Sequence, residues 1–142
     1  MEDPHAPRLR PQPESRFAAS QHAFDLNAVV LKLKEEFQAG EEGHRQITLY
    51  KQDSTTVALF IFGHLTRLPP HRAKGIVTIQ VLKGHLQITA EGQAHTLRGG
   101  NLLVLGPGVE HDLVAYEESE MLLTVHLSAT PRSPPPEWVG HR

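Results

Sequence analysis

Two histidines in turn-rich segments are the residues of this chain best suited to chemistry. His71 follows Pro69-Pro70, and His111 comes shortly after Gly106-Pro107-Gly108. An imidazole titrates near neutral pH, donates or accepts hydrogen bonds and is a common metal ligand. If the fold brings the two rings together, they can form an acid–base pair, contact a small ligand or bind a divalent cation.

The segment around each histidine resembles one of the two signature motifs of the cupin superfamily. The first motif is proline, any residue, histidine, any residue, histidine, three residues, glutamate, six residues, glycine; it aligns with 69–84 and matches His71. The second is glycine, five residues, proline, one residue, glycine, two residues, histidine, three residues, asparagine. It aligns with 100–115 and matches His111, with Gly106 in place of the proline and Ala115 in place of the asparagine. The chain therefore resembles a small single-domain cupin of the conserved-barrel type 2 class over roughly residues 45–128. This resemblance implies an all-β jelly-roll barrel.

Cupin barrels usually hold a divalent metal on three histidines and a glutamate, and two of these ligands are replaced here. The motif frame places Ala73 at the second histidine and Val77 at the glutamate. Neither side chain has a lone pair for a metal, and zinc or iron sites normally need at least three protein ligands. His126 and His95 are weak candidates for a third ligand. The resemblance leaves a divalent ion (Zn, Fe, Ni or Mn) open, but the donor set makes no cofactor firm and indicates a degenerate metal site.

An apolar wall is expected around the histidine pair. Val77, Ile79 and Val81 alternate along one strand and share a face, which lines the barrel interior in the family pattern. Leu113 has the same strand parity as His111. An apolar pocket with two imidazoles suits a small, partly apolar ligand such as an aromatic or carbonyl compound.

These features predict a small cupin-domain protein that binds such a ligand without a robust metal site. No reaction and no catalytic residue is assigned. Three alternatives stay open: a metal-dependent oxygenase or isomerase using His71, His111 and a further ligand; a metal-free sugar epimerase; and a scaffold whose histidines have no specific role.

Composition narrows the expected partners. The 142 residues carry a formal charge of −2 without a long block of like charge, so neither nucleic acid nor a membrane is an expected partner. Cysteine is absent, which excludes disulfides and thiolate metal sites. The first residues lack the apolar core of a signal peptide, so a cytoplasmic location is expected. The resemblance also implies a homodimer, because small cupins commonly pair through exposed sheet edges.

The pattern of apolar residues divides the chain into one domain between two proline-rich tails. We expect irregular tails at 1–22 and 130–142 and a single cupin domain at 23–129, with a helix at 25–38 and the barrel at 45–128. The helix has Leu26, Val29, Val30, Leu33 and Phe37 on one face and should lie across the outside of the barrel. Short alternating runs predict strands at 47–51, 56–62, 75–82, 85–90, 93–97, 102–105, 112–116 and 121–127. The run at 56–62 is apolar on both faces and should lie under the helix or in a subunit interface.

Overall fold

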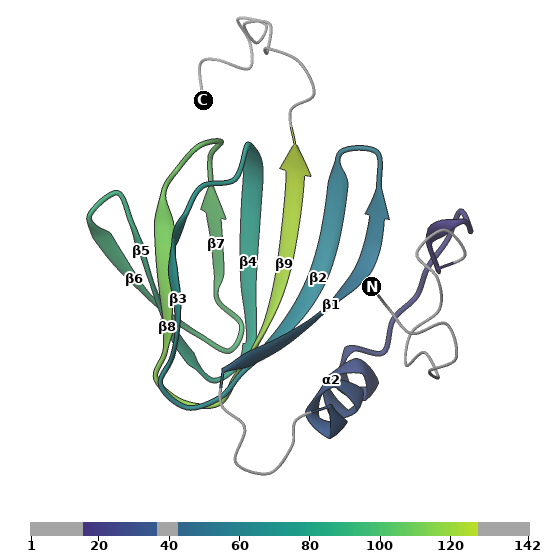
Figure 1. Ribbon diagram of the computed structural model, residues 1–142, viewed down its shortest axis with the longest axis horizontal. Coiled ribbons are helices and arrows are strands. Elements are labelled where there is room, and N and C mark those ends of the chain that lie inside the picture. The colour runs from purple at the N-terminus through teal and green to yellow at the C-terminus, as the bar shows by residue number, and fades with distance from the viewer. Residues whose placement is uncertain (1–15, 37–42, 128–142) are drawn as a thin grey trace, which may run out of the picture.

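The computed structural model describes residues 16–36 and 43–127, in which the helix α2 packs against a β-barrel (Figure 1). The helix α2 spans Leu26–Glu35. The strands are β1 (His44–Gln52), β2 (Thr55–Phe62), β3 (Thr66–His71), β4 (Gly75–Lys83), β5 (His85–Ala90), β6 (Gln93–Arg98), β7 (Leu102–Leu105), β8 (His111–Ala115) and β9 (Ser119–Leu127). Of the predicted tails, the structure describes residues 16–22 of the first, and the tail at 130–142 lies outside the described residues.

Two antiparallel sheets face each other and enclose the core. The five-stranded sheet has the order β1-β2-β9-β4-β7, and the four-stranded sheet has the order β3-β8-β5-β6. Strands that are neighbours in space are often distant in sequence, as in β2 beside β9 and β5 beside β8. This arrangement is a jelly roll, so the all-β cupin-type fold predicted from the sequence is confirmed.

Alternating side chains fill the interior, as the strand period of two requires. In β4 the buried positions alternate with exposed ones, and Val77, Ile79 and Val81 face inward. They meet the inward residues of β5 and β8, including Ile88 and Leu113, in one continuous apolar cluster. The apolar alternation of the sequence therefore identified the interior faces correctly.

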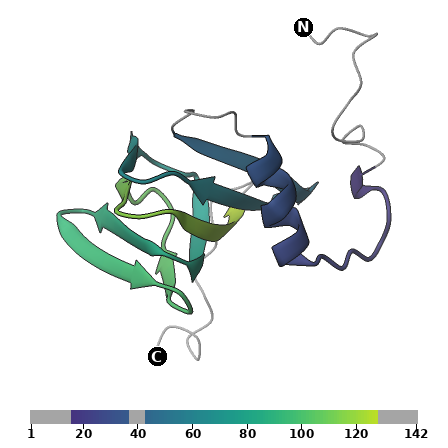
Figure 2. The same cartoon turned by 90° about the horizontal axis from the view of Figure 1, so that it is seen from below.

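The helix covers the outer face of the five-stranded sheet at β1 and β2 (Figure 2). Val30 and Leu33 are buried against Leu49, Leu59 and Ile61, which forms a second apolar cluster. This contact explains why β2 is apolar on both faces, and it confirms the predicted position of the helix.

The start of the helix is fixed by an N-terminal cap. Asp25 has an extended backbone, and its Oδ1 accepts a hydrogen bond from the amide of Ala28 at 3.2 Å. Phe37, which the sequence placed on the apolar face of the helix, lies outside the described residues. Within residues 16–36 and 43–127, no helix combines the length and the apolar character that crossing a bilayer needs.

One strand was not predicted from the sequence. Residues 66–71 contain Pro69 and Pro70, which cannot donate to a ladder and usually indicate a loop. In the structure these prolines lie in β3, at the edge of the four-stranded sheet. An edge strand tolerates proline because one side of its backbone needs no partner.

Candidate ligand-binding site

The two histidines singled out in the sequence meet at one end of the barrel. His71 ends β3 and His111 begins β8, and the two residues pair directly across these antiparallel strands. Their ring centroids are 4.3 Å apart with an interplanar angle of 60°. The fold therefore brings together His71, which matches the first motif, and His111, which matches the second.

A bulge in β3 turns His71 toward the same side as His111. Leu68 pairs with Leu113 and His71 pairs with His111, so three steps along β3 oppose two steps along β8. Without the extra residue, strand alternation would point the side chain at position 71 to the opposite face from Leu68. The irregularity at Pro69 and Pro70 thus has a geometric consequence, because it forms the imidazole pair.

His111 is the inner member of the pair, and its environment defines its tautomer. The side chain is 5% exposed, and Nδ1 lies 3.0 Å from the carbonyl oxygen of Val109. A carbonyl oxygen only accepts hydrogen bonds, so Nδ1 must carry the proton. In the neutral ring, Nε2 then keeps a free lone pair and acts as an acceptor. His71, by contrast, is exposed.

Contacts between two loops hold the backbone beside the histidines. The amide of Gly108 donates to the carbonyl of Ala73 at 2.9 Å. Arg72 donates through Nη1 to the carbonyl of Gly108 at 3.0 Å, and its Nη2 lies 3.3 Å from Glu110 Oε2. These contacts join the loop after β3 to the loop before β8, so each histidine is positioned relative to the other.

The apolar residues expected to line the pocket lie in the interior but are packed. Val77, Ile79, Val81 and Leu113 are all buried in the main apolar cluster. Residues at the margin of this cluster are only partly buried; they include Ala73, Val109 and Val125. Ala73 and Val109 are each two residues from one of the paired histidines, so these partly buried side chains are the apolar surface nearest to the pair in sequence.

The metal-binding side chains that the structure describes do not form a full metal site at the histidine pair. Among the described residues, no group of three or more histidine, cysteine or acidic side chains is arranged to hold a metal ion. Ala73 and Val77, at the positions of two cupin ligands, pack with the apolar cluster. The donor set of the pair is two imidazoles, one fewer than zinc and iron sites normally use.

Neither candidate for a third ligand is close to the pair. His126 belongs to the outer face of β9, because its neighbour Val125 packs inward, and its Nδ1 is 3.0 Å from Thr55 Oγ1. His95 pairs with Ile88, whereas His111 pairs with Ala90. Two strand spacings and two residues separate His95 from His111, which is roughly 12 Å.

Comparisons with known proteins agree with the fold. A family profile described as the AraC-like ligand binding domain matches residues 59–127. A cupin superfamily protein from Desulfitobacterium hafniense superposes with a TM-score of 0.61 at 19% identity, covering 86% of this chain and 94% of that one. A conserved protein of unknown function from Streptococcus pyogenes gives a TM-score of 0.61 at 22% identity, covering 69% and 86%.

A third structure, a cupin-2 domain-containing protein from Shewanella frigidimarina, has a TM-score of 0.58 at 20% identity, covering 72% of this chain and 93% of that one. A search of curated proteins found no match. Fold and matches together give this chain a cupin-type jelly-roll fold. At these identities the structural neighbours define the fold and assign no ligand or reaction.

Proposed function

We propose that the protein binds a small, partly apolar ligand at the end of the barrel where His71 and His111 lie, and that these two residues supply the polar contacts. The observation that carries the proposal is the pairing of these rings at 4.3 Å, with the inner ring anchored to a backbone carbonyl. The match to the AraC-like ligand binding domain supports a binding role. Ligand sites are typically apolar surfaces with a few convergent polar groups, and this end of the barrel has that composition.

The tautomer of His111 favours a ligand that donates a hydrogen bond. Its Nε2 is the acceptor of the neutral ring, so a hydroxyl or amide N–H on the ligand is a suitable partner. The apolar part of the ligand would cover Ala73, Val109 and Val125. A heavily hydroxylated sugar suits this margin less well, because its hydroxyls would be left without partners there.

Binding of phenol and toluene tests this preference, because phenol carries a hydroxyl where toluene carries a methyl group of similar size. We expect phenol to shift the backbone amide resonances around positions 71 and 111 at lower concentration than toluene. His111→Ala should remove that difference, whereas His126→Ala, which changes a histidine on the outer face, should preserve it. Equal binding of both probes to the unchanged protein would contradict the proposal.

The absence of a robust metal site is part of the proposal, and it has its own test. Two imidazoles make a weak and labile site, so we expect Zn²⁺, Ni²⁺ and Fe²⁺ to leave the melting temperature of the untagged protein unchanged. A ligand that binds the native state tightly raises the melting temperature through mass action. A stoichiometric metal in the purified protein, lost on His71→Ala, would instead favour a metal-dependent oxygenase or isomerase.

We also propose a homodimer formed through the edge strand β7. Its side chains are Leu102, Leu103, Val104 and Leu105, with no charge or proline, and Leu102 and Val104 are 61% and 56% exposed. The amide of Val81 donates to the carbonyl of Asn101. Hydrogen-bonded and non-hydrogen-bonded pairs alternate along an antiparallel ladder, so the backbone N–H and C=O groups of Leu102 and Val104 point away from β4. Proteins usually protect such edges with charges or proline.

Light scattering after gel filtration measures the mass directly. We expect a dimer that Val104→Lys converts to a monomer with an unchanged circular dichroism spectrum. Thr78→Lys is the matched control on the neighbouring strand β4, at the position that pairs with Val104. A monomeric unchanged protein would contradict the dimer and leave the ligand proposal intact.

A further inference from the structure

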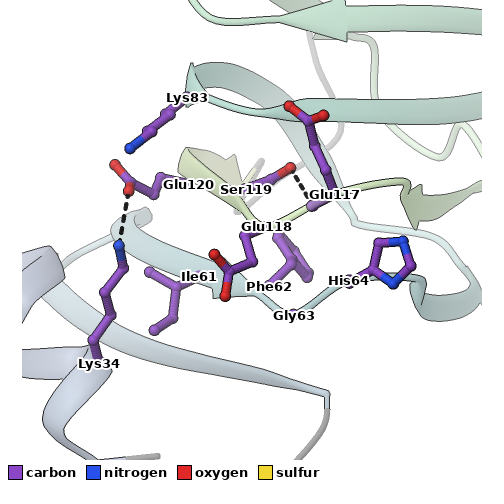
Figure 3. A pocket seen from close by; sticks show the side chains of 10 residues that line it. All are labelled: Lys34, Ile61, Phe62, Gly63, His64, Lys83, Glu117, Glu118, Ser119 and Glu120. Atoms are coloured by element: carbon purple, nitrogen blue, oxygen red, sulfur yellow. Dashed lines mark hydrogen bonds and ion pairs between the residues drawn. The ribbon is translucent and has the colours of Figure 1, made fainter.

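A cavity lies at the end of the barrel opposite to the histidine pair. Figure 3 shows the side chains that line it. It has a volume of about 770 Å³ and is bounded by the C-terminal half of α2, the turn after β2, the end of β4 and the turn before β9. This volume lies within the range of roughly 300–1,000 Å³ that is typical of small-molecule sites. The strand β8 runs from one end to the other: it begins at His111, and the turn that lines the cavity follows its last residue, Ala115.

One wall of the cavity is held firmly. Ser119 is 2% exposed, and its Oγ accepts from the amide of His85 at 3.0 Å and donates to the carbonyl of Glu117 at 2.8 Å. Gly84 packs so closely against the same turn that an added Cβ would lie 2.6 Å from the carbonyl oxygen of Glu118. The acidic side chains of this turn therefore project from a constrained backbone.

The charges of the cavity are separated into two sides. On one side Lys34 Nζ is 3.6 Å from Glu120 Oε2, and Lys83 is the direct partner of Glu120 across β4 and β9. This side has a formal charge of +1. The other side carries Glu117 and Glu118, with the carboxylate of Glu118 extending over the cavity (Figure 3).

The bottom of the cavity between these sides is apolar. Ile61 and Phe62, at the end of β2, line it there. A ligand with an alkyl segment between two opposite charges matches this order of surfaces. An isolated carboxylate or an isolated amine matches only one side, and the other side then repels it or stays unpaired.

We infer that this cavity binds a small zwitterion, an amino carboxylate whose ammonium group meets Glu118 and whose carboxylate meets Lys83. The site is distinct from the histidine pair and does not depend on the function proposed for it. Its selectivity comes from charge placement, since each end of the ligand meets a group of opposite sign within a cavity that partly excludes water.

The probe that tests the site is 5-aminopentanoate, compared with pentylamine and pentanoate, which each lack one of its charges. Calorimetry or amide shift mapping on the full chain should give at least about tenfold tighter binding of the zwitterion than of either analogue. That factor corresponds to about 1.4 kcal/mol. Equal binding of the three probes, binding of pentylamine alone, or no binding of 5-aminopentanoate would each overturn the inference.

Two variants test which side chain binds each charged end of the ligand. Glu118→Gln should remove the advantage of 5-aminopentanoate over pentanoate, and Lys83→Gln should remove its advantage over pentylamine. Both side chains are exposed, so the variants should keep the fold. Glu91→Gln, in the turn at the other end of the barrel, is the matched control and should leave all three affinities unchanged. Unchanged selectivity in Glu118→Gln would contradict the assignment.

Discussion

Arg72 lies 3.3 Å from Glu110, and each of these residues is the immediate sequence neighbour of one of the paired histidines. The same guanidinium donates to the carbonyl of Gly108. An exposed basic residue in a loop usually has no specific partner, but here it joins the loops on both sides of the candidate site. We expect Arg72 to restrict the motion of the loop before β8 more than it contributes to the free energy of unfolding.

Arg72→Gln tests this role. Because both side chains of the ion pair are more than half exposed, we expect the free energy of unfolding to fall by less than about 1 kcal/mol. Hydrogen exchange at the amides of Gly108 and Glu110 should nevertheless accelerate, because the loop loses two anchors. Lys74→Gln, which removes a charge from the same loop, is the control. Equal exchange in the two variants would show that the loop does not depend on the guanidinium.

The two histidines should differ in their effect on stability. His111→Ala removes a buried ring and its hydrogen bond to Val109, which leaves a partly buried carbonyl without this donor. We expect a loss of about 1–3 kcal/mol in the free energy of unfolding, measured by urea denaturation. His71→Ala removes an exposed ring and should change stability by about 0.5 kcal/mol or less. Similar losses from both variants would mean that the pair stabilises the fold as a unit.

The helix gives a direct test of the second apolar cluster. Leu33 is 1% exposed against the outer face of the five-stranded sheet, whereas Leu31, two residues earlier in the same helix, is 63% exposed. Leu33→Ala should lower the free energy of unfolding by about 2–5 kcal/mol, the usual range for a buried leucine. Leu31→Ala should have almost no effect, because alanine also has high helix propensity. A small effect of Leu33→Ala would indicate that the helix is only loosely attached.

Much of this fold could be predicted because most strands show their buried face in the sequence. Val77, Ile79 and Val81 alternate with more polar residues, and such a pattern depends only on neighbouring positions. The strand β3 lacks that signal, since its prolines are typical of loops. Its bulge depends on how β3 pairs with β8, which no local pattern records. The contact between His71 and His111 could therefore be expected only from the motif resemblance.

The cavity at the opposite end had no signal in the sequence. Lys34, Lys83 and Glu118 belong to a helix, a strand end and a turn that are far apart along the chain. Each is an ordinary surface charge when it is considered alone. The jelly-roll topology places β4 beside β9 and α2 against the same end, and only this arrangement separates the charges into two sides. A prediction from sequence would have needed the strand order first.

A comparison of Gly84 with Gly92 separates two reasons for glycine: close contact with neighbouring atoms, and a backbone conformation that other residues rarely adopt. Both have positive φ, 104° and 80°, so alanine is unfavourable at either position. A Cβ at Gly92 would meet no atom within 4 Å, whereas one at Gly84 would overlap the backbone of Glu118 and Ser119. We expect Gly92→Ala to lower the free energy of unfolding by about 1 kcal/mol and Gly84→Ala to lower it by clearly more.

Urea denaturation of the two variants measures this difference. If Gly84→Ala also displaces the turn that carries Glu118, amide shifts at 117–120 should change in the folded protein, while Gly92→Ala leaves them in place. Equal losses of stability would mean that the turn before β9 moves freely to accommodate the added methyl group. The rigid wall inferred for the zwitterion site would then be wrong, because its carboxylates would not be held in position.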